Sequence, residues 1–401
     1  MLHAKQLITV EDLKSPEGNL HPVQQAMIET YGSQCGFCTP GAVMSLFALY
    51  KNHTAPTEAE IRTALAGNLC RCTGYKPIIE AAMRACAPGY RPQDETATLE
   101  LLKEIRSESI VITTDQQTYS RPATVREALE VKRLHPDAIV MNGATDVALR
   151  VTKSHELFPF ILDLSGVDAL RGWSEDKDHV VVASGTTMED FSLLCRDRFP
   201  AIASMLEAFG SLQIRNLATV GGNLASASPV GDLMPLLIAH TADIILQSSR
   251  GERHVPAGRF VTGYRRTAAT DDELITAVVL PPAPREAIIK FYKVSRRHDL
   301  DIATVSGGFR LELENDDHVR DIILTYGGMA DRVRRAESAE AFLQGKAWDR
   351  PTVEEAMRCV DADFTPISDV RGSATMRRIA ARNLLFKFWT DSNRNGGGPW
   401  R

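Results

Sequence analysis

Four cysteines near the start of the chain stand in two closely spaced pairs. One pair is Cys35-Gly-Phe-Cys38, a C-x2-C pattern, and the other is Cys70-Arg-Cys72, a C-x-C pattern. Two such pairs brought together make a pocket of four thiolates, which is the ligand set of a [2Fe–2S] cluster. The spacing therefore indicates a metal site that carries electrons.

The residues next to these cysteines also favour a cluster. Cys38 is followed by Thr39-Pro40-Gly41 and then an apolar run, and proline suits the first turn of a helix. A helix is therefore expected to begin just after Cys38, where its N-terminal amides would favour the negative charge of thiolates. In an extended loop Cys70 and Cys72 point the same way, so both thiols are expected to reach one iron.

From the spacing alone, a structural zinc site and unligated thiols remain open. Four thiolates also bind zinc, although zinc sites usually show C-x2–4-C at both ends, and the C-x-C pair fits that pattern less well. Disulfides are less expected, because nothing in the composition indicates an oxidising compartment. The cluster is the preferred interpretation.

The composition is that of an ordinary soluble protein. The chain has 401 residues, 44% hydrophobic and 24% charged, with a formal net charge of −5. The length predicts two or three domains. The charge argues against nucleic acid and anionic membranes as partners, and no apolar run is long enough to span a bilayer. The start lacks the apolar core of a signal peptide, so we expect a cytoplasmic protein. Cys86, Cys195 and Cys359 are expected to be buried free thiols.

Hydrophobic periodicity predicts a helical bundle around the cysteines. Helices are expected at His21–Tyr31, at Gly41–Tyr50, after a capping box that starts at Thr57, and at Tyr75–Cys86. Residues from Pro88 to about 120 are polar and contain one short charged helix, which is typical of a linker.

The remainder of the chain shows two different patterns of expected helices and strands. Residues 121–285 alternate helices and strands, including a strand at Ala138–Met141, a helix over 188–209 and another strand that runs from Ala218 into a glycine turn ending at Asn223. Residues 287–391 show strands first and helices later, which predicts an α+β domain with an antiparallel sheet.

The middle region contains neither G-x-G-x-x-G nor a P-loop, but it has two glycine turns. These are Gly143-Ala144-Thr145-Asp146 and Gly221-Gly222-Asn223. Small residues let backbone N–H groups approach a pyrophosphate, so the two turns could hold one diphosphate between them. A single glycine turn is usually structural, so this interpretation depends on finding both in one domain. Asp232 precedes a helix, where an N-cap and a cofactor contact are both open.

Several longer motifs resemble one family. Gln34–Gly41 and Gly67–Tyr75 resemble the helical iron–sulfur domain of the molybdenum hydroxylases, and Gln213–Asn223 resembles their flavin loop. Ser228–Asp232 and Gly327–Ala330 match as well. A cluster domain, a flavin domain and this C-terminal domain in one chain, without a molybdenum domain, are similar to the small iron–sulfur/FAD subunit of bacterial xanthine dehydrogenase-type enzymes.

The resemblance implies a multidomain α and α+β protein. It implies a helical [2Fe–2S] bundle, an FAD-binding α+β domain of the vanillyl-alcohol-oxidase type, and a C-terminal α+β domain of the CO dehydrogenase flavoprotein type. The implied boundaries are 1–18 for a remnant of a ferredoxin-like domain, 19–88 for the bundle, 89–118 for a linker, 119–286 for the flavin domain, 287–391 for the C-terminal domain and 392–401 for a tail.

The resemblance also implies which residues hold each cofactor. The cluster would be held by Cys35, Cys38, Cys70 and Cys72. The FAD would be held by two pyrophosphate loops and by residues near the flavin, namely Ile139, Val140, Met141, Asn142, Gly143, Ala144, Thr145, Asp146, Phe209, Thr219, Val220, Gly221, Gly222, Asn223, Asp232, Tyr264, Leu274 and Lys293. Residues 292–301 would form a loop over the isoalloxazine that shapes access for NAD.

The implied activity is electron transfer. Electrons from a molybdenum cofactor on a separate large subunit would pass through the [2Fe–2S] cluster to FAD and on to NAD during purine oxidation, in a dimer of heterodimers. No residue of this chain would need to be a general acid or base.

Family members normally begin with a ferredoxin domain that holds a second cluster with C-x4-C-x2-C spacing, and the chain lacks that motif. Residues 1–14 resemble only the last strand of that domain. Alternative interpretations are a subunit for an aldehyde, nicotinate or CO, a redox-silent FAD-binding scaffold, and a zinc-stabilised interaction module.

Overall fold

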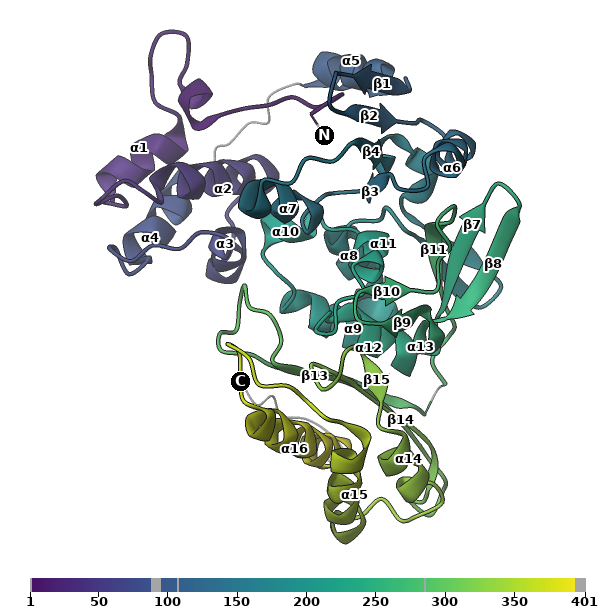
Figure 1. Ribbon diagram of the computed structural model, residues 1–401. Coiled ribbons are helices and arrows are strands. Elements are labelled where there is room, and N and C mark those ends of the chain that lie inside the picture. Colours follow the sequence, from purple (N-terminus) through teal and green to yellow (C-terminus); the bar gives the residue numbers. More distant parts are fainter. Residues whose placement is uncertain (1, 88–94, 107, 285, 394–401) are drawn as a thin grey trace. The chain divides into compact units, whose positions relative to one another are not determined.

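A computed structural model describes residues 2–87, 95–106, 108–284 and 286–393. The chain divides into two compact units (Figure 1). The first contains Met1–Glu108 and the short segment Gly210–Arg215, and the second contains Ser109–Phe209 and Asn216–Arg401. Each unit has buried hydrophobic clusters of its own. The expected linker falls partly, and the expected tail mostly, outside the described residues, at 88–94, 107 and 394–401.

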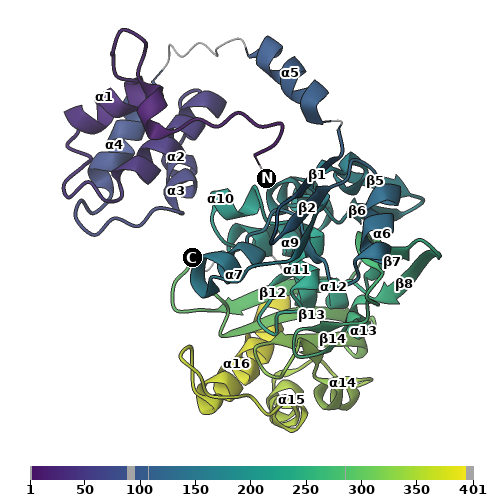
Figure 2. The same cartoon turned by 45° about the horizontal axis from the view of Figure 1, so that its top comes forward.

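Four helices make up the core of the first unit, as the periodicity predicted. They are α1 (Pro22–Glu29), α2 (Thr39–Asn52), α3 (Glu58–Leu65) and α4 (Lys76–Ala85). Figure 2 shows them gathered into one bundle. Val23, Leu46, Ile61 and Ile78, one from each helix, are at most 1% exposed. The apolar stripes of the four helices therefore meet in a single core.

The ends of these helices follow from local hydrogen bonds. At α3, the Thr57 side chain accepts from the N–H of Glu60 while Glu60 reaches back to the N–H of Thr57, so the predicted capping box is confirmed. Helix α2 begins directly after Cys38 and carries proline in its first turn, also as predicted. This start places the N–H groups of a helix beside the first cysteine pair.

Two further helices and one 3-10 turn complete the first unit. They are η1 (Val10–Leu13), α5 (Thr96–Arg106) and α10 (Leu212–Arg215). The expected strand within residues 1–14 is wrong, because the described residues 2–14 contain no strand and form η1 instead. Gln213 of α10 donates to the carbonyl of Ala64 at 2.8 Å and to the hydroxyl of Ser45 at 3.0 Å. These bonds explain why Gly210–Arg215 belongs to this unit.

The second unit begins with a four-stranded sheet in the order β1-β2-β4-β3. Its strands are β1 (Ile110–Thr113), β2 (Thr118–Arg121), β3 (Ile139–Met141) and β4 (Phe160–Asp163), and β2 and β3 both pair with β4 in parallel. Its helices are α6 (Val125–Leu134) and α7 (Val147–Ser154), and two 3-10 turns follow at η2 (Leu164–Gly166) and η3 (Asp168–Leu170).

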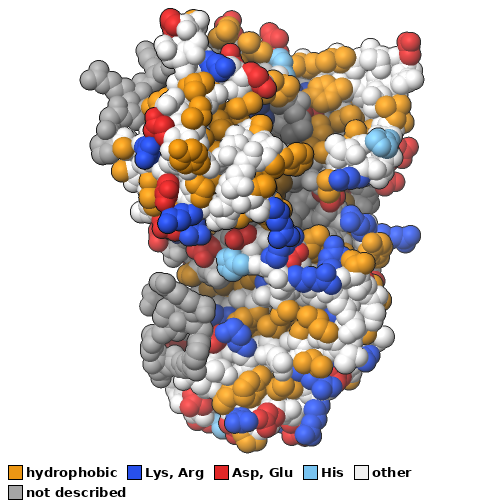
Figure 3. Space-filling view, turned by 90° about the vertical axis from the view of Figure 1, so that its left-hand side faces the viewer, with side chains coloured by type: hydrophobic (Ala, Val, Ile, Leu, Met, Phe, Trp, Pro, Cys, Tyr) orange, Lys and Arg blue, Asp and Glu red, His pale blue; other side chains and the backbone are white. Residues whose placement is uncertain are grey.

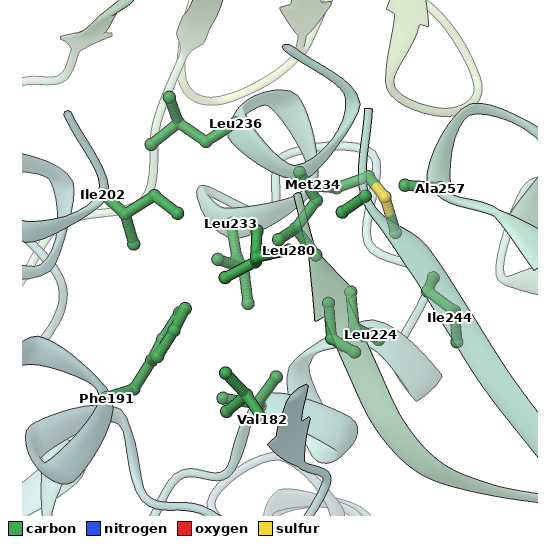
Figure 4. Close-up of a cluster of buried hydrophobic side chains, with 14 of the residues drawn as sticks. Val182, Phe191, Ile202, Leu224, Leu233, Met234, Leu236, Ile244, Ala257 and Leu280 are labelled. Carbon is green, nitrogen blue, oxygen red and sulfur yellow. The ribbon is translucent and has the colours of Figure 1, made fainter. Parts of the chain in front are cut away.

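A five-stranded antiparallel sheet follows, in the order β5-β6-β11-β7-β8. Its strands are β5 (Trp173–Asp176), β6 (His179–Ala183), β7 (Asp243–Ser248), β8 (Gly251–Pro256) and β11 (Leu274–Leu280), and a small pair is formed by β9 (Val261–Gly263) and β10 (Arg266–Thr267). The helices are α8 (Met188–Arg198), α9 (Pro200–Glu207), α11 (Val220–Ala225), α12 (Leu233–Ala239) and α13 (Ala257–Phe260). These helices and the sheet share one hydrophobic core. Figure 4 shows Leu233 of α12 in this core, among Phe191, Leu224 and Leu280.

The C-terminal part is an antiparallel sheet followed by helices, as predicted. The strands lie in the order β12-β13-β14-β15, at β12 (Ile288–Val294), β13 (Val305–Leu313), β14 (Val319–Gly327) and β15 (Arg334–Arg335). The helices are α14 (Glu337–Leu343), α15 (Arg350–Asp363) and α16 (Ala374–Ser392). Strands β13 and β14 pack against α12 as well as against α14 and α16, so almost all of β13 is buried.

Three local expectations are corrected by the structure. The segment Ala218–Asn223 is not a strand that enters a turn, because Val220–Ala225 is helix α11 and Thr219 is its N-cap. The helix expected over 188–209 is two helices, since Pro200 starts a new one after the non-helical Phe199. Cys86 and Cys195 are buried as expected, but Cys359 is only half-buried.

No helix among the described residues combines the length and the apolar character that a membrane span requires.

Candidate cofactor sites

The structure brings the two cysteine motifs together. Cys35 lies close enough to Cys72, and Cys38 close enough to Cys70, for the pKa of one thiol to be shifted by the other, so each pair takes one cysteine from each motif. Cys35 and Cys72 are exposed, whereas Cys70 is 8% exposed. The expectation that Cys70 and Cys72 bind one iron stays a prediction.

This paired arrangement differs from a site for a single ion. Among the residues that the structure describes, no three His, Cys, Asp or Glu side chains gather closely enough to hold one metal ion. A [2Fe–2S] cluster has two irons, and each iron takes two cysteine ligands. Two pairs of thiols fit that requirement.

The four thiols have different electrostatic environments. The hydroxyl and the N–H of Thr73 lower the pKa of Cys70 to about 7. The N–H of Phe37 lowers the pKa of Cys35, whereas burial raises the pKa of Cys38. A metal is bound by thiolates, so the donors around Cys70 favour the state that binds.

A short network of hydrogen bonds fixes the second cysteine loop. Thr73 Oγ1 lies 3.1 Å from Cys70 Sγ and accepts from the N–H of Tyr75 at 3.2 Å. The N–H of Cys70 donates to the Tyr75 hydroxyl at 2.9 Å. Gly74 and Tyr75 both have positive φ, at 67° and 68°. The loop thus turns sharply back on itself, which holds Cys70 between two side chains that the residue pattern had not singled out.

The two glycine turns of the second unit also lie side by side. The Thr219 hydroxyl donates to the carbonyl of Asn142 at 3.3 Å and accepts from the N–H of Gly222 at 3.2 Å. A Cβ on Gly143, whose φ is +78°, would lie 1.8 Å from the carbonyl oxygen of Leu217. Only glycine fits that approach. The two glycine turns predicted from the sequence therefore lie close together. The second of them is the first turn of helix α11.

Asp232 and Lys293 form a buried ion pair in the second unit. Lys293 Nζ lies 2.7 Å from Asp232 Oδ2 and donates to the carbonyl of Ala208 at 3.0 Å, and both side chains are less than 10% exposed. Burial raises the pKa of Asp232, and the Lys293 ammonium offsets part of that shift. Asp232 occupies the N-cap position of α12 without making a capping bond, so its side chain is not used as a helix cap.

The remaining expected flavin residues lie in different settings. Phe209 follows Ala208, the carbonyl partner of Lys293, and packs against the main core. Leu274 is 3% exposed at the start of β11, in a cluster against which Val140 packs. Tyr264 is 63% exposed in the turn between β9 and β10, and its neighbour Arg265 lies 4.0 Å from Asp146. Leu274 therefore lies in the core on which β3 packs, and the turn that carries Tyr264 lies beside the first glycine turn.

The loop between β12 and β13 is held at both ends. The N–H groups of Arg296 and Arg297 donate to Asp301 Oδ2 at 2.9 and 3.0 Å. At the far end, the buried guanidinium of Arg377 donates to the carbonyls of Thr304, at 2.5 Å, and Gly328, at 2.8 Å. Arg377 was not found from the sequence, because an arginine inside a helix carries no pattern that marks it as buried.

Three families match successive parts of the chain. The [2Fe-2S] binding domain matches residues 9–83, the FAD binding domain in molybdopterin dehydrogenase matches residues 113–283, and the CO dehydrogenase flavoprotein C-terminal domain matches residues 290–392. The chain thus contains, in this order, an iron–sulfur domain, an FAD-binding domain and a C-terminal flavoprotein domain of the kinds found in molybdenum hydroxylases. The expected kinds of domain and their order along the chain are confirmed.

Relatives within this family include enzymes with different substrates in their names. The xanthine dehydrogenase of Emericella nidulans is 31% identical over 448 residues, which cover 96% of this chain and 33% of that protein. Aldehyde oxidase 4 of Cavia porcellus is 28% identical over 447 residues, which cover 97% of this chain and 33% of that protein. The chain spans about a third of the length of the curated relatives it matches.

A solved structure shows the same architecture. A carbon monoxide dehydrogenase from Hydrogenophaga pseudoflava, which lacks the Mo-pyranopterin moiety of the molybdenum cofactor, matches with a TM-score of 0.65 and 26% identity. The match covers 69% of this chain and 96% of that chain. The molybdenum hydroxylase fold of this chain therefore rests on sequence and on structure.

The residues present fit the two cofactors of the family. The cysteine loops offer four thiols with N–H and hydroxyl donors directed at the sulfurs, as an anionic cluster requires. The glycine turns offer backbone N–H groups at the start of a helix, with no room for a side chain at Gly143. Both donor sets lie in regions that match the corresponding families.

Proposed function

We propose that this chain is the electron-transfer subunit of a xanthine dehydrogenase-type molybdenum hydroxylase. Electrons would enter at a cluster held by Cys35, Cys38, Cys70 and Cys72 and leave through FAD to NAD. The observation that carries the proposal is the pairing of four thiols across two loops, in a chain that also places two glycine turns side by side. When bound, a [2Fe–2S] cluster passes single electrons and a flavin collects two for hydride transfer to NAD.

The chain's own residues would position the flavin. Thr219 joins the two proposed pyrophosphate loops through its bonds to Asn142 and Gly222. The pair of Asp232 and Lys293 is buried, and Asp232 Oδ1 has no hydrogen-bond partner among the described atoms. A buried carboxylate oxygen without a partner is costly, so a polar group of a bound cofactor is a fitting partner for it.

A large subunit with a molybdenum cofactor would carry out purine oxidation. Three hydrophobic side chains close to the cysteine motifs are exposed, namely Phe37 (94%), Tyr31 (83%) and Leu69 (66%). Exposed hydrophobic side chains that lie together are typical of a surface that a partner protein covers, which here would be the large subunit. Figure 3 shows exposed hydrophobic side chains scattered among charged ones on one face of the molecule. The assembled enzyme would be a dimer of heterodimers in the cytoplasm. All seven cysteines lie within the described residues and are free thiols, which suits a reducing compartment.

The first test is the cofactor content of the purified full-length chain. We expect about two irons per FAD, measured by metal analysis and absorption, with an EPR signal after reduction. Co-expression with the molybdenum subunit should then give xanthine-dependent formation of NADH. Zinc in place of iron would support the zinc-stabilised module, and FAD without iron would support a redox-silent scaffold. Either result would refute the proposal.

A subunit for another substrate is the second candidate. The aldehyde oxidase relative and the carbon monoxide dehydrogenase structure favour it, because their regions shared with this chain are about as similar as those of the xanthine dehydrogenases. The pocket that selects the substrate would lie on the large subunit. The same assembled enzyme, tested with xanthine, an aldehyde, nicotinate and CO, distinguishes the two candidates by which compound reduces the cluster.

A further inference from the structure

Thr73 touches a sulfur of the proposed cluster site through its side chain. Its Oγ1 lies 3.1 Å from Cys70 Sγ, and the same oxygen accepts the N–H of Tyr75 at 3.2 Å. A hydroxyl has one hydrogen to donate and two lone pairs. The Tyr75 N–H occupies one lone pair, so the hydroxyl hydrogen is left for the sulfur.

The direction of this bond follows from the chemistry of a ligand. A cysteine that binds iron is a thiolate, which has no hydrogen and can only accept. Thr73 must then be the donor. This bond places a donor from the same short loop against the sulfur of Cys70, the one cysteine of the two motifs that is buried.

The other cysteine loop lacks an equivalent arrangement at its own threonine. Thr39 follows Cys38 directly, but its hydroxyl bonds to the hydroxyl of Ser33 at 2.7 Å. At Cys35 the N–H of Phe37 lowers the pKa of the thiol. The hydrogen bonding of the two loops is therefore unequal, with the stronger set at Cys70.

We propose that Thr73 is a positioning residue that raises the reduction potential of the cluster by donating its hydroxyl hydrogen to Cys70 Sγ. Reduction adds one electron to the cluster and breaks no bond, and the electron comes from the molybdenum subunit or, in the experiment below, from dithionite. The added electron increases the negative charge on the sulfurs, so a donor at Cys70 stabilises the reduced form more than the oxidised form. The inference rests on the ligand set of the proposed function.

The test is an EPR-monitored redox titration of the purified full-length chain and its variants. Thr73→Val keeps the shape of the side chain and removes the hydroxyl. We expect full iron content and a lower potential, with the ratio of reduced to oxidised cluster at a fixed potential falling about tenfold, which is ~59 mV for a one-electron couple. Thr73→Ser keeps the hydroxyl and should restore the wild-type potential.

Two control variants separate the sulfur bond from its surroundings. Thr39→Val removes a hydroxyl beside Cys38 that bonds to Ser33, so the potential should not move. Tyr75→Phe removes the acceptor of the Cys70 N–H but leaves the Thr73 hydroxyl, so its shift should be much smaller than that of Thr73→Val.

The outcomes are distinct from those for the proposed function. Wild-type protein without iron would refute the ligand set and this inference together. An unchanged potential in fully loaded Thr73→Val would refute the inference alone, as would an equal shift in Thr39→Val. Loss of the cluster from Thr73→Val with retention in Thr73→Ser would also overturn it, because the hydroxyl would then serve assembly rather than the potential.

Discussion

The cysteine loops and the flavin-side residues are held in opposite ways. The bonds around Cys70 join residues at most five positions apart and lie close to the surface. In the second unit, Asp232 and Lys293 are 61 positions apart, Thr219 and Asn142 are 77 apart, and the ion pair is buried. The Cys70 loop is therefore held by local turns, whereas the flavin-side residues are held by contacts between segments that only the folded core brings together.

The difference predicts different consequences of mutation. A change at an exposed cysteine should remove a cofactor while the fold is kept, because little packing is lost. A change at the buried pair should reduce stability and cofactor binding together, because the same side chains support both.

The largest effect is expected at Cys35. Cys35→Ala removes one of four ligands at an exposed position, so the cluster should be lost almost completely. Metal analysis should show no bound iron, while the far-UV circular dichroism and the FAD content stay at wild-type levels. Cys359→Ala is the control, because that thiol lies in α15 and should not affect iron. Full iron content in Cys35→Ala would contradict the proposed ligand set.

The buried ion pair should give the next largest effect. Lys293→Met leaves the Asp232 carboxylate buried without its partner, which should cost about 3–5 kcal/mol of stability. Differential scanning calorimetry should show a lower Tm, and FAD should be lost on gel filtration. Lys290→Met changes an exposed lysine on the same strand, β12, and should leave both measurements unchanged. Equal behaviour of the two variants would show that the pair supports neither stability nor the cofactor.

Acid should weaken the second unit through His240, which lies at the end of α12. Burial, with a smaller contribution from Arg310, lowers the pKa of His240 to about 4. The unfolded chain binds this proton near its ordinary value of about 6.5, so the unfolded state takes up more protons as the pH falls. Stability is therefore complete above pH ~6.5 and should decline by up to about 3 kcal/mol as the pH falls toward 4.

Urea unfolding at several pH values, followed by flavin fluorescence, measures this decline. His240→Leu should flatten it, because no titrating group remains at that position. His179→Gln, an exposed histidine of β6 in the same unit, should leave the slope as in the wild type. If His240→Leu retains the full slope, the acid sensitivity comes from another group.

The smallest effect is expected at Thr219. Thr219→Val removes both the cap of α11 and the bond to Asn142, and it should cost about 1 kcal/mol of stability. Titration with FAD should also show weaker binding, since the two glycine turns lose their direct link. Thr124→Val removes a comparable cap from α6, where the hydroxyl accepts from the N–H of Glu127. It should cost similar stability without weakening FAD binding, and a parallel loss of FAD there would contradict a specific role for Thr219.

Prediction from sequence succeeded where the signal was local. The helix after Cys38 and the capping box at Thr57 depend on neighbouring residues, and both are present. The prediction failed at Ala218–Asn223, because the Val220-Gly221-Gly222 pattern also suits a strand that enters a turn. A helix forms there because Thr219 caps it and because Gly221 packs tightly against Ser184. A Cβ on Gly221 would lie only 2.6 Å from the Cβ of Ser184.

The sequence by itself determined the cysteine motifs, the glycine turns and the order of the domains, because residue types at short spacing limit what a backbone can do. The tertiary structure decided which thiols face each other, that Asp232 meets Lys293 rather than capping α12, and that Arg377 lies in the core with the carbonyl of Thr304 as a partner. These contacts join residues far apart in the chain. Their formation depends on which apolar faces pack together, and the spacing of the residues does not contain that information.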